Sequence, residues 1–481
     1  METIYRVFLG PAVLAGLFSV GGYFTVRLKC FWWLHPKKCL REMRGEHSAA
    51  SIFPAVTLAL GGTMGVGNIA GVALACLTGG AGAIFWMVVS ALFAMAVKYA
   101  EVVLAMDTRV QNADGTYTGG APFYMRREDG RNGVFPYLFS ALCVLSAVFQ
   151  GSLLQGNALG ESCAETLGVA PCLIGIALGF LTLFFLLFAR SFISRATSCL
   201  IPVSTVLYLI LCLSLLFLRR CEIPAVFARI FREAFSPRAG VAGVAGYLFT
   251  DAARIGCARG LVSNEAGCGT SPLAHVSARG TSPAGQGLWG IFEVFLDTVV
   301  VCTLTALVCL SSGAEGDPNA PLSYVTDALA VLFGRAAQPL LTASVAGFAL
   351  ATVVSWAYYG LTCLSSLSRS AWVRVLYLVL YAGGLMVGAV AKPVMVYHLI
   401  DLLLGVMTLT NLFFLVKKAD RVVALSAESG LIPRRPECAT AISPRETKGA
   451  QANLPVPAPK SRGSEPRVPP RHSRESPRPP K

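Results

Sequence analysis

Apolar residues dominate long stretches of this chain, and short polar segments separate those stretches. An apolar run of about 20 residues is long enough for a helix to cross the roughly 30 Å hydrocarbon core of a bilayer. The pattern predicts an all-α integral membrane protein with about eleven transmembrane helices. The predicted spans are 9–27, 49–78, 83–106, 136–158, 171–189, 194–218, 246–272, 286–311, 337–366, 370–391 and 396–416.

The composition supports this prediction and excludes a soluble globular protein. Of the 481 residues, 54% are hydrophobic and 14% are charged, whereas soluble domains carry about 25% charged residues. We assign residues 1–420 to one polytopic domain, with core helices at about 49–416. Residues 421–481 are assigned to a basic, proline-rich tail, because from residue 433 onward the chain holds 12 of its 27 prolines and no long apolar run. A segment this polar is expected to be a disordered cytoplasmic tail.

The distribution of charge predicts how the chain crosses the membrane. Basic residues follow the first span far more often than they precede it, which predicts an N-terminus outside and a C-terminus in the cytoplasm. One loop, at 219–238, carries arginines on the predicted outer side, and its amphipathic RIFREAF stretch is expected to lie along the interface. The expected location is the bacterial cytoplasmic (plasma) membrane, as a multi-pass protein. Half of the formal net charge of +14 belongs to the tail, so the basic balance does not indicate nucleic-acid binding.

One short stretch inside the second span, GGTMGVGNIAG at 61–71, contains five glycines. It matches a loose dinucleotide-binding pattern, but such a motif needs a preceding strand, an amphipathic helix and a nearby acidic residue. Here both flanks are apolar and the next acidic residue is Glu101. A small-residue packing face is the usual explanation for glycines in a membrane helix, yet these glycines point around the helix. With Thr63 and Asn68 among them, the stretch predicts local unwinding of the helix.

A second interruption lies five spans later. The seventh predicted span contains RGLVSNEAGCGTSP, in which polar residues, glycines and a proline interrupt the apolar run. A pair of interrupted helices at matching positions in two halves is typical of inverted-repeat secondary transporters. Unwinding exposes N–H groups that suit a carboxylate and C=O groups that suit a cation. The pattern therefore predicts one N-terminal helix plus a 5+5 inverted-repeat core with two discontinuous helices.

Ionisable residues inside predicted spans need a partner or a role, because each is costly at the bilayer centre. We expect Glu265 to act as a helix-end or gating carboxylate, and Asp297 to pair with Arg254 or Arg259. Lys98 and Glu101 lie near the inner end of the third span, where pairing or snorkelling is expected. His275 lies in a polar loop, and the simplest expectation is a solvated side chain.

Several motifs together resemble the alanine or glycine:cation symporter family. They are GGTMGVGNIAGVALA, GAIFWMVVSALFAMAVKYAE, DGTYTGGAPFYM, ARGLVSNEAGCGTSPLAH and FLDTVVVCTLTALVCLSSG, and the similarity runs from about Gly10 to Lys418. The resemblance implies a leucine-transporter-type fold and sodium-coupled symport of alanine, in L or D form, and glycine. It implies Na⁺ as the coupling ion, a small neutral amino acid as substrate and no enzymatic activity.

The resemblance also implies roles for individual residues. The substrate would contact Thr63, Gly65, Gly67, Asn68, Gln155, Asn264, Gly267 and Trp356, with Trp356 closing the pocket over the methyl group. Sodium would bind between the first broken helix and the ninth span, at Gly61, Met64, Thr352 and Ser355. The chain departs from the family pattern here, with Ala351 where members often have serine and Ser355 where they often have glycine. Unchanged sodium affinity is therefore not expected.

Two alternative functions remain open from the sequence. One is a proton-coupled transporter of another small solute on the same fold. The other is a sensor that binds an amino acid without moving it. The sequence contains no nucleophile and base pattern that indicates an integral-membrane enzyme. It does not determine stereoselectivity, stoichiometry or oligomeric state.

Overall fold

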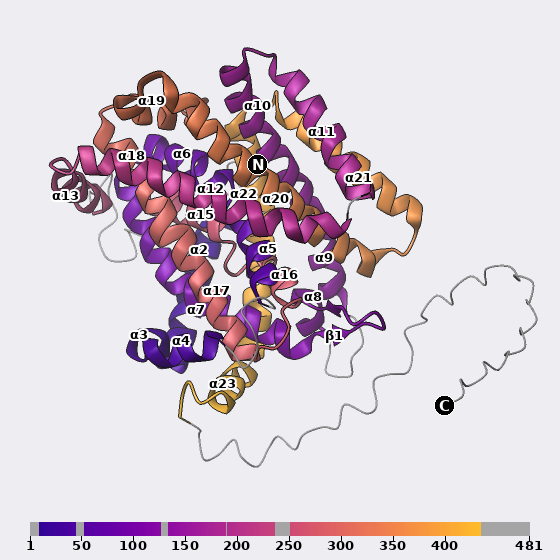
Figure 1. Ribbon diagram of the computed structural model, residues 1–481. Helices are drawn as coiled ribbons and strands as arrows, with labels where there is room; N and C mark the ends of the chain where they lie inside the picture. Colours follow the sequence, from indigo (N-terminus) through magenta and orange to yellow (C-terminus); the bar gives the residue numbers. More distant parts are fainter. Residues whose placement is uncertain (1–8, 45–51, 127–132, 189, 236–250, 434–481) are drawn as a thin grey trace, which may run out of the picture. The chain divides into compact units, whose positions relative to one another are not determined.

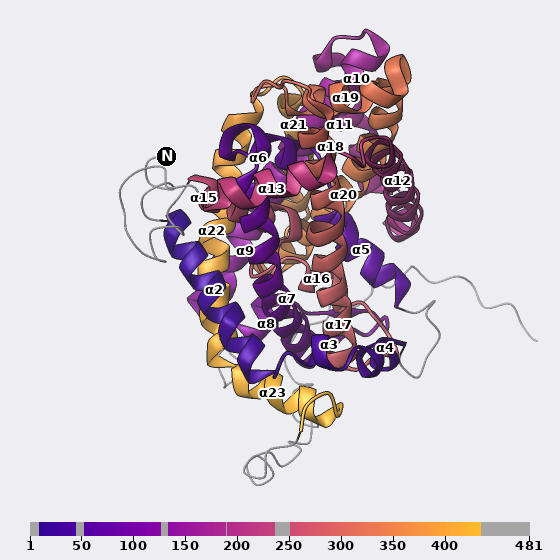
Figure 2. The ribbon, with the colours of Figure 1, turned by 90° about the vertical axis from the view of Figure 1, so that its left-hand side faces the viewer.

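The computed structural model describes residues 9–44, 52–126, 133–188, 190–235 and 251–433, and this part is mainly helical (Figures 1 and 2). Long apolar runs form helices because a helix pairs its own backbone groups, which hydrocarbon cannot do. The helices at the predicted spans are α2 (Gly10–Arg27), α5 (Phe53–Thr63) with α6 (Ala70–Gly79), α7 (Gly82–Thr108), α9 (Val134–Ser146) with α10 (Leu154–Leu167), α11 (Pro171–Phe188), α12 (Arg190–Leu218), α15 (Asp251–Asn264), α17 (Pro283–Val294) with α18 (Thr303–Ser312), α20 (Ala337–Leu367), α21 (Ala371–Gly388) and α22 (Pro393–Lys417).

Length and hydropathy support a smaller number of spans than the sequence predicted. Within the described ranges, seven helices are long and apolar enough to cross a bilayer, and the bent pair α5–α6 makes an eighth. The predicted spans at 9–27, 171–189 and 246–272 correspond to α2, α11 and α15, which lie outside that number. The chain is thus a helical membrane protein. The eleven-helix count and the two five-helix repeats remain predictions.

Two of the long helices contain a π-helical segment. The segment η4 (Ala147–Leu153) joins α9 to α10, and η5 (Phe295–Cys302) joins α17 to α18. A π-bulge widens the helix by one residue per turn and is frequent at functional sites. Both segments lie beside the helix breaks described below.

Shorter elements connect the long helices. They are α3 (Phe31–Leu34), α4 (Pro36–Arg44), the 3-10 turn η3 (Val66–Asn68), the hairpin β1 (Val110–Gln111) and β2 (Tyr117–Thr118), α8 (Ala121–Tyr124), α13 (Ile223–Ala234), α16 (Pro272–His275), α19 (Pro321–Phe333), η6 (Gly334–Ala336) and α23 (Ala419–Glu428). The RIFREAF stretch is helical as expected: α13 buries Val226, Ile230 and Ala234 and exposes Phe227 and Phe231.

The helical part of the chain extends past the boundary predicted at residue 420. In α23, Arg421 forms an ion pair with Asp107 of α7 (2.6 Å), and Ser426 Oγ lies 2.8 Å from Tyr99 Oη. Residues 421–433 therefore belong to the packed domain rather than to the tail. The rest of the predicted tail, residues 434–481, lies outside the described residues.

Candidate functional site

The helix that contains the glycine run opens where the sequence predicts. After α5, Gly65 is extended (φ −121°, ψ −159°), and α5 makes an angle of 56° with the helical segment Val66–Gly79. Asn68 Oδ1 accepts a hydrogen bond from Gly65 N (3.0 Å), and Trp356 Nε1 donates one to Gly62 O (3.2 Å). These side chains pair backbone groups that the interrupted helix leaves without helical partners.

The end of α5 packs directly against α20. A Cβ atom on Gly65 would lie 2.7 Å from Thr352 Oγ1, and one on Gly61 would lie 2.5 Å from Ser355 Oγ. Only glycine permits this approach, so these glycines have a packing role as well as a role in unwinding. Ser355 Oγ is buried and has no hydrogen-bond partner among the described residues. An unpaired hydroxyl beside a helix break is the kind of oxygen that a hard cation binds.

The second break lies at the end of α15, as predicted. Glu265 adopts a left-handed conformation (φ 52°), which is uncommon for a residue other than glycine and indicates local strain. Asn264 Oδ1 accepts from Ala266 N (3.0 Å), and Glu265 Oε2 accepts from Thr270 Oγ1 (2.6 Å). Asn411 Nδ2 donates to Gly267 O (2.9 Å). The continuation on the far side of this break is short, because α16 spans only Pro272–His275.

Asp297 connects the two breaks. It lies in the π-helical segment η5 and is fully buried. Its Oδ1 accepts from Asn68 Nδ2 of the first break (2.5 Å), and its Oδ2 accepts from Ser263 Oγ at the second (2.6 Å) and from Thr298 Oγ1 (2.8 Å). The predicted ion pair of Asp297 with Arg254 or Arg259 is wrong. Neutral hydrogen-bond donors from both broken helices surround this carboxylate instead.

The two arginines have other acidic partners. Arg259 forms a buried ion pair with Asp401 of α22, and its guanidinium carbon lies 4.5 Å from the centre of the Tyr397 ring. Arg254 pairs with Asp251 three residues earlier (2.6 Å). Asp401 lies in the last predicted span, and no local pattern there indicates which cation it pairs with.

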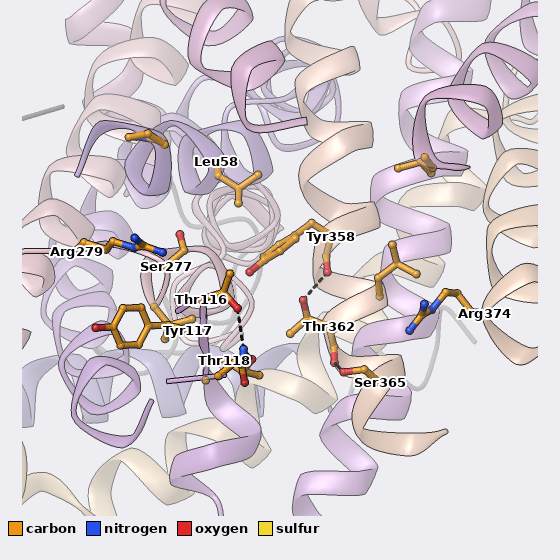
Figure 3. A pocket seen from close by; sticks show the side chains of 16 residues that line it. Leu58, Thr116, Tyr117, Thr118, Ser277, Arg279, Tyr358, Thr362, Ser365 and Arg374 are labelled. Carbon is orange, nitrogen blue, oxygen red and sulfur yellow. Dashed lines mark hydrogen bonds between the residues drawn. The ribbon is translucent and has the colours of Figure 1, made fainter. Parts of the chain in front are cut away.

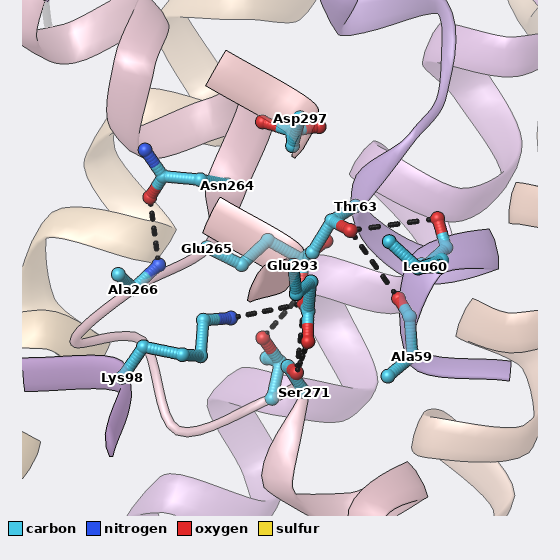
Figure 4. Close-up of polar contacts among 12 residues, drawn as sticks. Ala59, Leu60, Thr63, Lys98, Asn264, Glu265, Ala266, Ser271, Glu293 and Asp297 are labelled. Carbon is cyan, nitrogen blue, oxygen red and sulfur yellow. Dashed lines mark hydrogen bonds and ion pairs between the residues drawn. The ribbon is translucent and has the colours of Figure 1, made fainter. Parts of the chain in front are cut away.

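A second buried polar cluster supports the segment after the second break. Glu293 of α17 accepts from Lys98 Nζ (3.2 Å) and from Ser271 Oγ (2.9 Å) (Figure 4). His275 Nε2 lies 2.8 Å from its other oxygen. All four residues are fully buried. The expectation of a solvated His275 is therefore wrong, because this loop folds back against α7 and α17. The expected pairing of Lys98 is confirmed.

Glu101 supports the same segment from α7. Its Oε1 accepts from Gly269 N (2.8 Å) and from Asn411 Nδ2 (2.5 Å). Gly269 has a positive φ of 78°, and a Cβ atom there would lie 2.9 Å from atoms of Ala121 and Phe139, so glycine is required. Glu101 therefore pairs with groups at the second break rather than reaching toward water.

Two glutamines lie next to the breaks on the fourth predicted span. Gln155, which the resemblance singles out, donates through Nε2 to Gln150 O (3.1 Å). Gln150, which we did not predict, lies in η4 and donates through Nε2 to Val262 O of α15 (3.1 Å). Both are buried, and neither Oε1 atom has a hydrogen-bond partner within the described ranges.

The structure thus brings most predicted site residues together around the two breaks. Thr63, Gly65, Gly67 and Asn68 lie in or beside the first break, and Asn264, Glu265 and Gly267 form the second. Trp356, Thr352 and Ser355 approach the first break from α20, while Gly61 and Met64 flank the end of α5. However, Asn68 and Asn264 use both polar groups of their side chains within the protein. Their side chains hold the breaks in place.

Sequence reasoning missed Gln150, Ser263 and Glu293 as parts of the site. Glu293 carries a signal that could have identified it. It is an acidic residue inside a predicted span and therefore needs a partner, and Lys98 in another span needs an acidic one. Gln150 and Ser263 carry no comparable signal, because small polar residues in membrane helices often bond to their own backbone.

A cavity of about 690 Å³ lies at the opposite end of α5 from the first break (Figure 3). Leu58, Tyr358, Thr362 and Ser365 line it together with the β1–β2 hairpin. Tyr359 contacts both ends of this part of α5, since its hydroxyl lies 3.5 Å from the carbonyl oxygen of the cavity-lining Leu58 and would meet a Cβ atom on Gly62.

Comparison with known proteins gives a consistent result. Residues 1–427 match the model of the sodium:alanine symporter family. A relative from Methanococcus maripaludis, named sodium/alanine symporter AgcS, is 34% identical over 439 residues, or 88% of this chain and 95% of that protein. A Bacillus subtilis relative, named probable sodium/glutamine symporter GlnT, is 31% identical over 84% of each chain. Among solved structures, a sodium-coupled sialic acid symporter matches 89% of this chain and 86% of its own, with a TM-score of 0.45 and 12% identity.

Proposed function

Because this chain belongs to the sodium:alanine symporter family, we propose that it carries a small neutral amino acid, alanine in L or D form or glycine, together with Na⁺. The family and its named members are transporters rather than enzymes, and they support cation-coupled amino-acid symport as the general activity. The observation that carries the proposal is the meeting of two broken membrane helices at Asp297.

Substrate binding follows from the chemistry of the breaks. An amino acid is a zwitterion, and an unwound helix offers N–H groups to its carboxylate without burying a second full charge. We place the substrate between Thr63, Gly65, Gly67 and Asn68 of the first break and Asn264 and Gly267 of the second, beside Gln155 and Trp356. The backbone carries most of this binding, because the asparagine side chains are already engaged in the protein. Trp356 supplies an apolar wall, which favours a methyl group over a much larger side chain.

Sodium is assigned to the contact between α5 and α20. The oxygen donors are the carbonyl groups of Gly61 and Met64 and the hydroxyl groups of Thr352 and Ser355. Thr352 Oγ1 donates to Phe348 O (3.0 Å), which leaves its lone pairs for a cation. The unpaired Ser355 Oγ supports the same assignment. Na⁺ and substrate would share the first broken helix, so each stabilises the conformation that the other needs, and this linkage is reciprocal.

Transport would proceed by alternating access, with the two repeats rocking around the broken helices. We assign the cavity lined by Leu58 of α5 to the release route, and we assign Tyr359, which contacts Leu58 O, as the side chain that would move for release. We place this cavity on the cytoplasmic side, with the N-terminus outside and the C-terminus inside.

The test is uptake of labelled L-alanine, D-alanine and glycine into proteoliposomes, with and without an inward Na⁺ gradient. Labelled glutamine belongs in the same series, because the relative named as a glutamine symporter favours that substrate as a second candidate. We expect alanine or glycine uptake that stops when choline replaces Na⁺. Uptake that persists in sodium-free buffer and follows a proton gradient would favour the proton-coupled alternative.

A second arm separates transport from sensing. A chain that ends at residue 433 keeps α23 and both helix breaks. A transporter should retain uptake after this truncation. Binding of alanine without any uptake, in both the full chain and the truncated one, would favour a sensor.

A further inference from the structure

Gln150 and Gln155 lie close together on the fourth predicted span, and the side-chain amide of each donates to a backbone carbonyl. Gln155 Nε2 donates to the backbone carbonyl of Gln150, and Gln150 Nε2 donates to the carbonyl of Val262 (3.1 Å in each case). An amide nitrogen is only a donor and an amide oxygen only an acceptor. Rotating either amide by 180° would place its oxygen against a carbonyl oxygen, so these contacts fix both orientations.

The fixed orientation leaves two buried acceptors without donors. Gln150 is 4% exposed and Gln155 is 1% exposed, and neither Oε1 atom has a partner in the part of the chain that the structure describes. Buried side-chain oxygens are almost always paired, and an unpaired one in a native structure needs an explanation. A ligand that brings N–H donors would provide those missing partners.

Gln150 lies close to groups at both helix breaks. Val262 directly precedes Ser263, which donates to Asp297 at the second break. Gly151, the residue after Gln150, faces the Trp356 side chain, and a Cβ atom there would clash with it. The π-helical geometry of η4 brings this part of the helix against both α15 and α20. Gln150 is thus in contact with the second break and beside the tryptophan of the first.

We propose that Gln150 is a specificity-determining residue which, with Gln155, accepts hydrogen bonds from the primary ammonium group of the substrate. This inference rests on the proposed function and adds the part of the substrate that the glutamines recognise. Two neutral carbonyl dipoles attract an ammonium group but leave no uncompensated charge when the substrate departs. A carboxylate in the same place would remain as a buried charge in the empty carrier.

The inference predicts discrimination by the number of N–H donors on the substrate nitrogen. Glycine has three, whereas N,N-dimethylglycine has one and leaves one carbonyl without a partner. A hydrogen bond to a charged group contributes about a factor of ten or more in affinity. We expect the unmodified protein to favour glycine over N,N-dimethylglycine, and alanine over N,N-dimethylalanine, by about that factor in kcat/KM.

Gln150→Met tests this directly, because methionine keeps the length of the side chain and removes its acceptor. We expect the preference for glycine over N,N-dimethylglycine to fall about tenfold, with most of the change in KM for glycine. Gln338→Met is the matched control: Gln338 donates through Nε2 to Ser162 O (3.3 Å) and Glu165 Oε2 (2.9 Å), and has no contact with either break. It should leave the preference unchanged.

The outcomes separate this inference from the proposed function. If the unmodified protein takes up no alanine, glycine or glutamine with Na⁺, the proposed function fails and this inference fails with it. If uptake is normal and Gln150→Met keeps the full preference, the inference is overturned and the proposed function stands. If Gln150→Met does not insert into the membrane, Gln150→Glu decides, since it keeps an acceptor and loses the donor to Val262. Retained preference in that variant supports the inference, and loss of preference overturns it.

Discussion

Trp356 forms the apolar wall of the proposed substrate pocket. It is fully buried, its indole N–H donates to Gly62 O, and its ring contacts Tyr359 edge-on at a centroid distance of 5.6 Å. It therefore holds the backbone of the first break while it presents an aromatic face. A tryptophan in a membrane span is commonly an interface residue, but burial and this hydrogen bond place Trp356 inside the helix bundle.

Trp356→Ala should lower kcat/KM for alanine by about 30-fold or more, because buried aromatic anchors contribute about 2 kcal/mol or more to binding. Trp356→Phe keeps a ring and loses the donor to Gly62 O, so its loss should be intermediate. Trp372→Ala is the control, because Trp372 lies on α21 and is 83% exposed. Labelled alanine uptake, normalised to the amount of inserted protein, measures all three. Near-normal uptake by Trp356→Ala would contradict the site assignment.

Ser355 gives a separate test of the ion site. Because its hydroxyl has no hydrogen-bond partner among the residues described, Ser355→Ala should cost little stability. It should raise the Na⁺ concentration for half-maximal alanine uptake about fivefold, the effect of losing roughly 1 kcal/mol of ligation. Ser344→Ala on the same helix is the control, since Ser344 is buried but donates to Leu340 O (3.2 Å). An unchanged sodium dependence in Ser355→Ala would remove this residue from the proposed ion site.

At the scale of elements, Asp297 makes the two broken helices a single unit. Both carboxylate oxygens are used: Oδ1 by Asn68, and Oδ2 by Ser263 and Thr298. A displacement of either broken helix must therefore disturb a hydrogen bond of the other. Repeats that rock against each other would keep this connection or exchange it for another.

Asp297→Leu should uncouple the helices, because leucine has a similar size but no acceptor for the donors of Asn68 and Ser263. An unpaired buried donor costs about 1–3 kcal/mol, so we expect a lower thermal unfolding midpoint together with strongly reduced uptake. Asp327→Leu on α19 is the control, since that aspartate is exposed. A variant with unchanged uptake and unchanged midpoint would show that Asp297 does not connect the breaks in the working protein.

Some of these elements could be predicted from the sequence, and others could not. Apolar runs located the long helices, and GGTMGVGNIAG and SNEAGCG located both breaks, because these features are local in the chain. The π-helical segments, α19 and the packing of α23 on α7 were not predicted, since they depend on contacts between distant segments. His275 is the clearest case. In sequence it follows a polar, glycine-rich stretch, yet the fold places it against Glu293, which lies 18 residues away.

At the scale of the whole molecule, the elements divide between two ends. The helices α3, α4 and α23 lie at one end, and α19 and the end of α10 lie at the other (Figure 2). The 690 Å³ cavity is lined by the hairpin that follows α7 and by the end of α20, and these segments belong to the end that carries α23. The predicted cytoplasmic C-terminus would place this cavity on the cytoplasmic side of the membrane.

Cysteine labelling tests this orientation. Thr362 and Ser365 line the cavity, whereas Ser323 lies on α19 at the other end. In a background that lacks Cys438 of the predicted tail and the exposed cysteines Cys172, Cys199 and Cys221, a membrane-impermeant thiol reagent should modify Thr362→Cys in inside-out vesicles only. Ser323→Cys should react in right-side-out vesicles only. The reversed pattern would place the C-terminus outside and reverse the proposed direction of release.

The same variant reports on alternating access. If the cavity is the release route, closing the inner side must bury position 362 behind the end of α5 and the hairpin. Na⁺ and alanine added together should then slow labelling of Thr362→Cys, while either one alone should have a smaller effect because the two bind cooperatively. Ser365→Cys, which lines the same cavity, should show the same trend. Equal labelling rates with and without both ligands would mean that this cavity does not open and close during transport.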